Sequence, residues 1–440
     1  MKFFKLGELP ELVLYILAGV VLVGTAFFMF PGLLAVFFTE QFKIAVRVLY
    51  NLFPFWGPPL FGFVFFNAWV AYVRTKFIAS RKFILLEIRL PREVNKSPLA
   101  MELALSGLNV TSGESTWYDV YALGKVRPWF SLEIVSIEGN IHFYIWARED
   151  YKPVVEAQLY GQYPDIEIFE VPDYTEAVPH YDPEKRYVLG HEFKLAKPDP
   201  YPIKTYVDYG LDKDPKEEFK IDPLTSVLEF MAAIKKGEQM WLQIIIQGHK
   251  KKLKHGTLFG STDIQEEAKE EIKKLLAELK QEKPEASEGG FSYSRIPTKS
   301  EAEVMAAIDR NAGKLNYDCG IRFIYTTTPE AFVGARIPQS INLLNPFTSK
   351  ELNGFKFGRG TYTEYPWEDF MYIRMDILKR RLLHSYRTRS WFHGAHKHAP
   401  FILSSEELAT IYHFPGGVLQ VPSVERVMSK KAEAPGNLPS

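Results

Sequence analysis

A long apolar segment without charge, near the N-terminus, constrains this chain more than any other feature of its sequence. No charged side chain occurs between Glu11 and Glu40, and nearly all of residues 12–38 are apolar. A helix of about 20 such residues crosses the hydrocarbon core of a bilayer. Because Pro31 interrupts the stretch, we expect a membrane span over residues 12–30 and a turn along the interface after it.

A second apolar segment, Trp56–Val73, is also free of charge and contains Pro58 and Pro59 near its start. Basic residues precede the first segment and follow the second, so the positive-inside rule places both ends on the cytoplasmic side. The sequence therefore predicts a multi-pass protein of the cytoplasmic (inner) membrane, with the lipid bilayer as a partner and a soluble body that faces the cytoplasm. A cleaved signal peptide and an apolar hairpin that never crosses fully are the alternatives.

The charges of the chain balance, with 53 Lys and Arg against 53 Asp and Glu. No global field therefore draws the protein to nucleic acid, and any basic binding surface has to be local. The single cysteine, Cys319, excludes an internal disulfide framework and a zinc site of several thiolates. Because it lies in an apolar stretch, we expect a buried core thiol.

Alternating apolar residues at 83–90 predict a half-buried strand that begins the soluble body. Cap, turn and β-rich signals divide the segment that follows into further elements. These elements are a helix from Ser97 to Gly107, strands at 129–137 and 141–147, a helix at 154–160 and a strand at 165–171. The order βαββαβ is that of ferredoxin-like domains.

A second unit repeats this plan more loosely. Its predicted elements are a strand at 187–195, a helix from Asp222 to Gly237, a strand at 241–247, a charged amphipathic helix at 265–283, a helix opened by a Thr298–Glu301 capping box, a strand at 319–327 and a helix from Pro329 toward Leu344. We therefore expect an α+β fold: an N-terminal transmembrane helical hairpin, tandem ferredoxin-like modules and a C-terminal helical segment. The predicted boundaries are 1–78 for the anchor, 79–176 for the first module, 177–360 for the second module with its charged helical insertion at 262–290, and 361–440 for the C-terminal segment.

The motifs of common enzymes are absent from the sequence. There is no GxxxxGK phosphate loop, and Gly358–Gly360, the nearest stretch, lacks the lysine and the helix start. HExxH, GxSxG and dinucleotide fingerprints are absent as well. We therefore predict a non-catalytic protein without a cofactor. An enzyme whose site is assembled from scattered residues is a rival hypothesis.

Four histidines gather near the C-terminus: His384, His393, His396 and His398. Neutral imidazoles at such spacing can hold zinc. Neither a clear carboxylate partner nor a fixed helical face accompanies them, and a basic, partly exposed loop explains the same residues. We therefore predict no metal site.

Cationic and aromatic side chains are interleaved in the same region. Guanidinium groups beside stacking rings suit single-stranded nucleic acid or an RNA loop. The candidates for nucleic-acid contact are Arg374, Lys379, Arg380, Arg381, Arg387, Arg389 and Lys397. Glu368 and Asp369 at the start of the predicted helix, with cations at its end, also match the helix dipole without any ligand. Both interpretations stay open at this point.

The segment LSSEELATIYHFPG at 403–416 predicts a short helix with a Ser404–Glu407 capping box, which we call the EEL helix. In wording, residues 403–439 resemble the junction that precedes the motor domain in membrane-anchored DNA-transfer ATPases related to type IV secretion coupling proteins, of the HerA and FtsK-like superfamily. The resemblance of residues 1–400 is architectural. In those relatives an ATPase domain follows, whereas this sequence ends at Ser440.

The resemblance therefore implies a membrane and assembly half whose ATPase is a separately encoded polypeptide. The function that it implies is a non-catalytic, membrane-anchored component of a type IV secretion- or conjugation-like machine that transfers DNA or protein. Homo-oligomers and DNA are further expected partners. The expected docking residues for the ATPase are Glu406, Glu407, Leu408, Ile411 and Tyr412. The alternative is a membrane-anchored scaffold or envelope-assembly protein that binds other proteins without nucleic acid.

Overall fold

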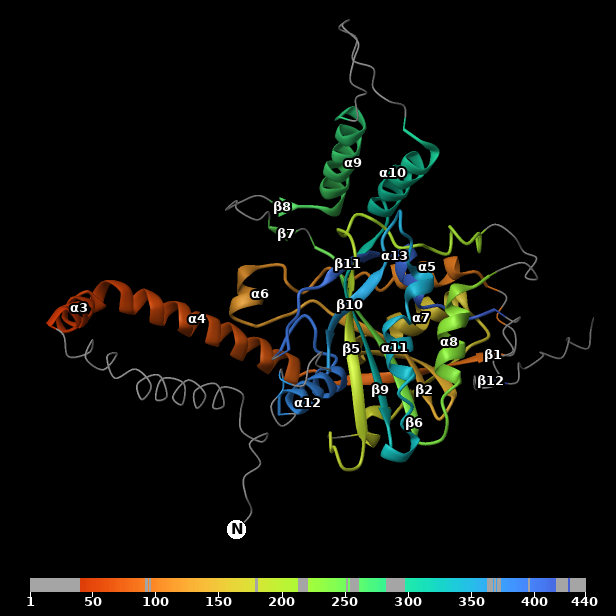
Figure 1. The fold of residues 1–440 in the computed structure, drawn as a ribbon, viewed down its shortest axis with the longest axis horizontal. Helices are drawn as coiled ribbons and strands as arrows, with labels where there is room; N and C mark the ends of the chain where they lie inside the picture. The colour runs from red at the N-terminus through yellow and green to blue at the C-terminus, as the bar shows by residue number, and fades with distance from the viewer. Residues whose placement is uncertain are drawn as a thin grey trace, which may run out of the picture.

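A helical arm extends from a body of one large sheet and flanking helices in the computed structural model of the protein (Figure 1). The arm consists of α3 (Glu40–Asn51) and α4 (Phe53–Ala79), and the predicted span Trp56–Val73 falls within α4. The structure describes residues 40–91, 94, 96–178, 181–212, 221–250, 252–253, 261–281, 297–361, 367, 369, 373–394, 396–416 and 426–427. The predicted span at 12–30 lies outside the described residues and stays a prediction.

The first half of the sheet has the strand order β4-β1-β3-β2, and each neighbouring pair is antiparallel. Its elements are β1 (Phe83–Pro91), α5 (Pro98–Ser106), α6 (Trp117–Tyr121), β2 (Trp129–Ile137), β3 (Asn140–Arg148), α7 (Lys152–Gln162) and β4 (Glu167–Val171). The predicted hairpin is confirmed, because Ile137 pairs with Asn140 across a turn in which Glu138 and Gly139 have positive φ.

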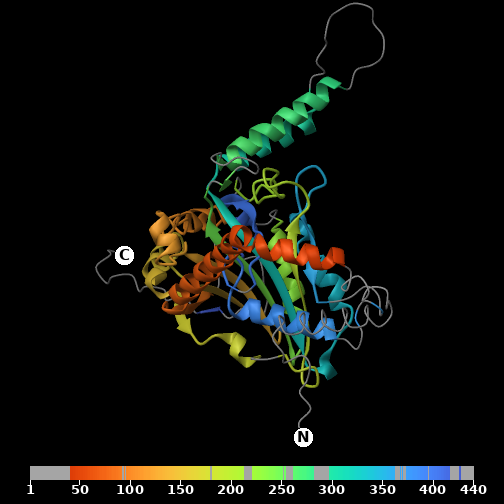
Figure 2. The same cartoon turned by 90° about the vertical axis from the view of Figure 1, so that its left-hand side faces the viewer.

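The second half repeats this arrangement, with the order β10-β5-β9-β6 and antiparallel neighbours. Its elements are β5 (Tyr187–Leu195), α8 (Pro223–Ala232), β6 (Glu238–Gly248), α9 (Ile264–Gln281), α10 (Lys299–Ala312), β9 (Asn316–Thr327), α11 (Arg336–Ile341) and β10 (Phe355–Gly360). A short two-stranded pair, β7 (Lys252–Leu253) with β8 (Ser261–Thr262), precedes α9. Figure 2 shows α9 projecting from the body, as a charged insertion between two strands would.

One predicted helix of this half is wrong in extent. The stretch from Pro329 toward Leu344 forms a 3-10 turn at Pro329–Ala331 and then the short helix α11. Val333 and Gly334, which lie between them, have low helix propensity.

The two halves join edge to edge through β2 and β6, which pair antiparallel with Glu133 opposite Gln243 at the centre of the register. Each strand thereby pairs the backbone N–H and C=O groups that would be unpaired at the edge of a sheet. Two further strands complete the ten-stranded sheet: β11 (Phe401–Ser404) lies antiparallel to β9, and β12 (Arg426–Val427) lies parallel to β1.

Both faces of this sheet are buried. Helices α5, α7, α8 and α13 (Ser405–Ile411) contribute to the core on one face, and α12 (Ile373–Arg387) with the end of α4 contributes to the core on the other. Along β1, Leu86 faces the first core and Leu85 the second. The prediction of a half-buried first strand is therefore wrong. Its polar residue Glu87 is buried too, because His142 and Arg89 pair with it at 2.9 and 3.1 Å.

Several predicted helix starts are confirmed. Capping boxes are present at Thr298–Glu301 before α10 and at Ser404–Glu407 before α13. The basic helix α12 begins at Ile373, later than the predicted start at Glu368 and Asp369, and the Asp369 carboxylate accepts hydrogen bonds from the backbone N–H groups of its first turn. Cys319 is a buried free thiol in β9, as expected.

Candidate functional site

Exposed large apolar side chains cover the helical arm. Phe63 is 68% exposed, and residues 63–66 are four consecutive apolar side chains that point in different directions around α4. The exposed set on the arm is Ile44, Val46, Val48, Leu49, Tyr50, Leu52, Phe53, Phe55, Trp56, Leu60, Phe61, Phe63, Val64, Phe65, Phe66, Trp69 and Tyr72. A helix that is apolar on all sides belongs in a protein core or a membrane, and within the described part of the chain these side chains of α4 are exposed.

The two helices of the arm meet at a bend of 65°. Among the residues that the structure describes, no single helix has both the length and the apolar composition of a membrane crossing, whereas α3 and α4 together do. The Trp56 indole donates a hydrogen bond of 3.0 Å to the Leu49 carbonyl across the bend. Pro58 and Pro59 follow within the first turns of α4, where they remove two backbone donors.

The base of α4 is anchored in the body. Val73 is buried, and Phe77 and Ile78 pack against the core on the α12 side of the sheet. Gly124, which follows α6, has φ +63°, and a Cβ there would lie 2.3 Å from the carbonyl carbon of Val73. Only glycine permits this approach, so the loop after α6 and the backbone of α4 form one fixed unit.

The basic stretch does not form one exposed surface, because its residue Arg389 lies in the core. Its guanidinium donates two hydrogen bonds, of 3.0 and 3.1 Å, to the two carboxylate oxygens of Glu133 on β2. A second carboxylate, Asp173, accepts from the same group. Arg389 is 1% exposed and Glu133 is fully buried, so the prediction that Arg389 contacts nucleic acid is wrong. Its charge is used inside the protein.

Two tyrosines complete this buried network. The Tyr174 hydroxyl donates to Glu133 at 2.7 Å and lies 2.8 Å from the Tyr386 hydroxyl. Burial is the main cause that raises the pKa of both tyrosines well above the usual value, and the negative charge of Glu133 adds to it. Burial opposes the charge of Arg389, yet Glu133 and Asp173 hold the pKa of Arg389 above its ordinary value. The network is therefore an ion pair with neutral phenols, set where the two halves of the sheet meet.

Lys379 is also buried, and its ammonium group lies over the rings of Tyr181 and Tyr187 at 5.3 and 4.7 Å. Burial lowers the pKa of Lys379. The prediction that Lys379 contacts nucleic acid is therefore wrong as well. Of the other candidates, Arg374 and Lys397 are exposed, and Arg380, Arg381 and Arg387 are half-buried. Their role in nucleic-acid contact stays a prediction.

The four histidines of this region contact different residues. His393 packs against the Trp129 ring, and burial lowers the pKa of His393 to about 3. His384 and His396 contact each other, whereas His398 lies 3.5 Å from Glu192. Within the described part of the chain, no three His, Cys, Asp or Glu side chains are grouped so as to hold a metal ion.

The EEL helix, α13, is an internal element of the body. Leu408, Ile411 and Tyr412 lie in the core cluster with α5, and the Tyr412 hydroxyl donates to the Tyr144 carbonyl at 3.1 Å. Glu406 is buried too. The prediction that these side chains dock a separate ATPase is therefore wrong, because the surface that they would present is covered by their own chain.

Glu407 is held inside the body as well. Its carboxylate closes the capping box with Ser404 and accepts a hydrogen bond of 2.9 Å from the backbone N–H of Ile203. Burial raises the pKa of Glu407 to about 7 against these hydrogen bonds. Its predicted docking role is wrong for the same reason as that of its neighbours.

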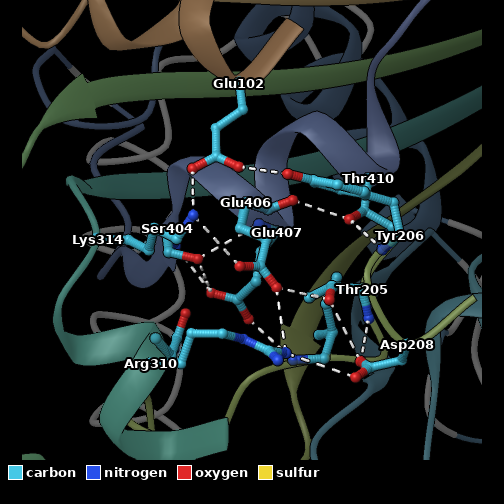
Figure 3. A network of polar contacts seen from close by, with 12 residues as sticks. Glu102, Thr205, Tyr206, Asp208, Arg310, Lys314, Ser404, Glu406, Glu407 and Thr410 are labelled. Atoms are coloured by element: carbon cyan, nitrogen blue, oxygen red, sulfur yellow. Dashed lines mark hydrogen bonds and ion pairs between the residues drawn. The ribbon is translucent and has the colours of Figure 1, made fainter. Parts of the chain in front are cut away.

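A network of charged groups surrounds the start of this helix (Figure 3). Lys314 lies 2.8 Å from Glu102 and 3.5 Å from Glu406, and Arg310 lies 3.3 Å from Glu406. The Tyr206 hydroxyl donates a hydrogen bond of 2.7 Å to Glu102. The buried carboxylates of Glu102 on α5 and of Glu406 are therefore paired with cations from α10 and the loop after it, and with a donor from the segment after β5. These contacts tie the EEL helix into the second half of the body.

The contacts described so far lie in the sheet and in the segments that pack on it. The sequence model of the family described as "Domain of unknown function (DUF8128)" matches residues 84–426. The chain belongs to this family. No curated protein matches it.

The DUF8128 region runs from β1 to β12 and includes both halves of the sheet, the Arg389 network and the EEL helix. The arm of α3 and α4 precedes it. The apolar surface of the arm is thus outside the DUF8128 match, and the buried networks are inside it.

The sequence interpretation missed several polar residues of the DUF8128 core. Asp222, the predicted start of a helix, caps α8 and also lies 3.0 Å from His413, and Glu238 is buried beside Tyr325. Glu102 was not singled out at all. A signal was present, because Glu102 stands alone among the apolar residues of α5.

Proposed function

We propose that the protein is a non-catalytic assembly component that is anchored in the cytoplasmic membrane by α3, α4 and the apolar segment before them. The observation that carries this proposal is the arm, on which aromatic and aliphatic side chains are exposed on all sides of α4. Each such side chain favours an apolar environment by about 1.5–3 kcal/mol. Together they make a bilayer the environment that the arm requires.

We also propose that each half of the sheet is a ferredoxin-like module. The support is the strand order, since β4-β1-β3-β2 and β10-β5-β9-β6 both place the first strand between the fourth and the third. That is the arrangement of the split βαβ plan, with a crossover helix after the first and third strands. In this proposal the modules are fused through β2 and β6, and charged helices are inserted into the second.

The machine in which the protein acts is, in this proposal, of the type IV secretion or conjugation kind, with a separately encoded ATPase at the cytoplasmic face. The support is the resemblance of residues 403–439 together with the apolar arm. Burial of the EEL helix favours the second candidate, a membrane-anchored scaffold that binds other proteins without nucleic acid. Purification of the full chain in mild detergent and identification of its companions separates the two, because only the first predicts an ATPase among them.

Insertion of α4 is tested by cysteine labelling. Phe63→Cys carries an environment-sensitive fluorophore, and the full chain is reconstituted into vesicles that contain lipid with a quencher deep in the acyl chains. Leu103→Cys on α5, another exposed apolar position, is the matched control. We expect loss of emission at position 63 and none at 103. Equal emission at both positions, or nucleotide hydrolysis by the purified protein alone, would overturn the proposal.

A further inference from the structure

We propose that α6 lies in the lipid headgroup layer and sets the depth at which α4 enters the bilayer. The proposal rests on the proposed function, because it takes α4 to be in the membrane. Its partner is the lipid surface itself.

The exposed side chains of α6 have the chemistry of a membrane interface. Trp117 is 74% exposed, Tyr118 is 53% exposed, and Leu123 in the loop after the helix is 42% exposed. Tryptophan and tyrosine have an apolar ring and a polar group, and they gather where the headgroups meet the acyl chains.

α6 is also fixed at one level of α4. The Trp69 indole donates a hydrogen bond of 2.8 Å to the Tyr121 carbonyl, and the rings of Phe66 and Tyr121 are 5.3 Å apart. Figure 1 shows α6 beside the half of α4 that is nearer the body. The close approach of Gly124 to Val73 holds the end of the α6 loop against the same helix. The aromatic surface of α6 therefore moves with α4.

In length alone, α4 agrees with one hydrocarbon layer; the apolar composition of a crossing is met by α3 and α4 together. From Phe53 to Trp69 or Tyr72 the helix rises about 24–29 Å at about 1.5 Å per residue, and the hydrocarbon core is about 30 Å thick. Beyond the level of α6 the first charges follow, at Arg74 and the exposed Lys76. These cations suit the headgroups on the side of the body.

The other end of α4 shows the complementary feature. After the 65° bend, α3 carries Glu40, Lys43 and Arg47 among apolar side chains. An amphipathic helix that turns away from the span lies along an interface. Polar markers therefore stand at both ends of the apolar length, and α6 marks the end next to the body. A protein partner would not require this spacing.

Depth-dependent quenching in vesicles tests the inference on the full chain. Leu123→Cys is labelled with the fluorophore used for position 63, and Tyr118→Cys repeats the measurement. Glu229→Cys, an exposed position on α8 at the far side of the body in Figure 1, is the control. Cys319 is buried, so the unchanged protein gives the labelling background. Circular dichroism equal to that of the unchanged protein shows that each variant is folded.

We expect a quencher on the headgroups to reduce emission at positions 123 and 118 more than a deep acyl-chain quencher does, and neither to act at 229. Emission at 123 and 118 that neither quencher changes, with position 63 still quenched, overturns this inference and leaves the proposed function intact. Stronger quenching by the deep label at 123 also overturns it, since α6 would then lie below the headgroups. Failure to quench position 63 refutes both proposals.

Discussion

Replacing Arg389 by methionine should unfold the body more easily rather than weaken a nucleic-acid contact. The guanidinium is 1% exposed and makes two hydrogen bonds, of 3.0 and 3.1 Å, to the fully buried carboxylate of Glu133. Removal of one partner leaves a buried charge without compensation, which costs about 3–5 kcal/mol. Asp173 loses its guanidinium as well. Methionine is flexible and apolar and fills much of the space of the arginine stem, so the loss reports the charge rather than a cavity.

Urea unfolding of the full chain in mild detergent, followed by tryptophan fluorescence, measures the change in the free energy of unfolding. The double variant Arg389→Met with Glu133→Gln removes both charges, and we expect it to recover most of the loss, because Tyr174 and Gln243 can still hydrogen-bond the new amide. Arg374→Met, at an exposed position of the same basic stretch, should change the free energy by less than about 0.5 kcal/mol. If Arg389→Met unfolds at the same urea concentration as the parent, the reasoning is refuted.

Three further changes test other parts of the structure. Burial lowers the pKa of His191 to about 4 from 6.5, so as pH falls below 6.5 the unfolded chain binds a proton that the folded chain does not. The free energy of unfolding of His191→Phe should therefore rise by about 2 kcal/mol relative to that of the parent between pH 7.5 and pH 5. Equal urea midpoints of the two proteins at every pH would contradict this. Gly124→Ala should lower the melting temperature, because its Cβ would meet the Val73 backbone at 2.3 Å and the native φ is +63°; an unchanged thermal scan would show that the loop relaxes freely. Lys314→Met should cost about 2 kcal/mol in urea unfolding, because the buried Glu102 loses its cation at 2.8 Å, whereas the exposed Lys299→Met is the neutral control.

The local elements of this protein follow from its sequence, because their signals lie within a few residues of one another. The strands predicted at 129–137 and 187–195 have the observed bounds of β2 and β5, and the pairs Thr298–Glu301 and Ser404–Glu407 marked two helix starts. The apolar, charge-free character of α4 is equally local. Such signals need no knowledge of the rest of the chain.

Burial and neighbourhood were decided by the tertiary structure. Arg389 and Glu133 stand 256 positions apart, and no pattern near either residue shows that they pair. The EEL helix has the composition of a surface helix, with two acidic side chains. Its burial is favourable because cations of α10 and the loop after it pair with Glu406, and because Ser404 and the backbone N–H of Ile203 donate to Glu407. The place of α6 beside α4 depends on the same kind of long-range contact, between Trp69 and Tyr121. The sequence shows which charged groups need a partner. Which partner each group has is decided by packing, because the pairing energy depends on distances in space that the order of residues does not give.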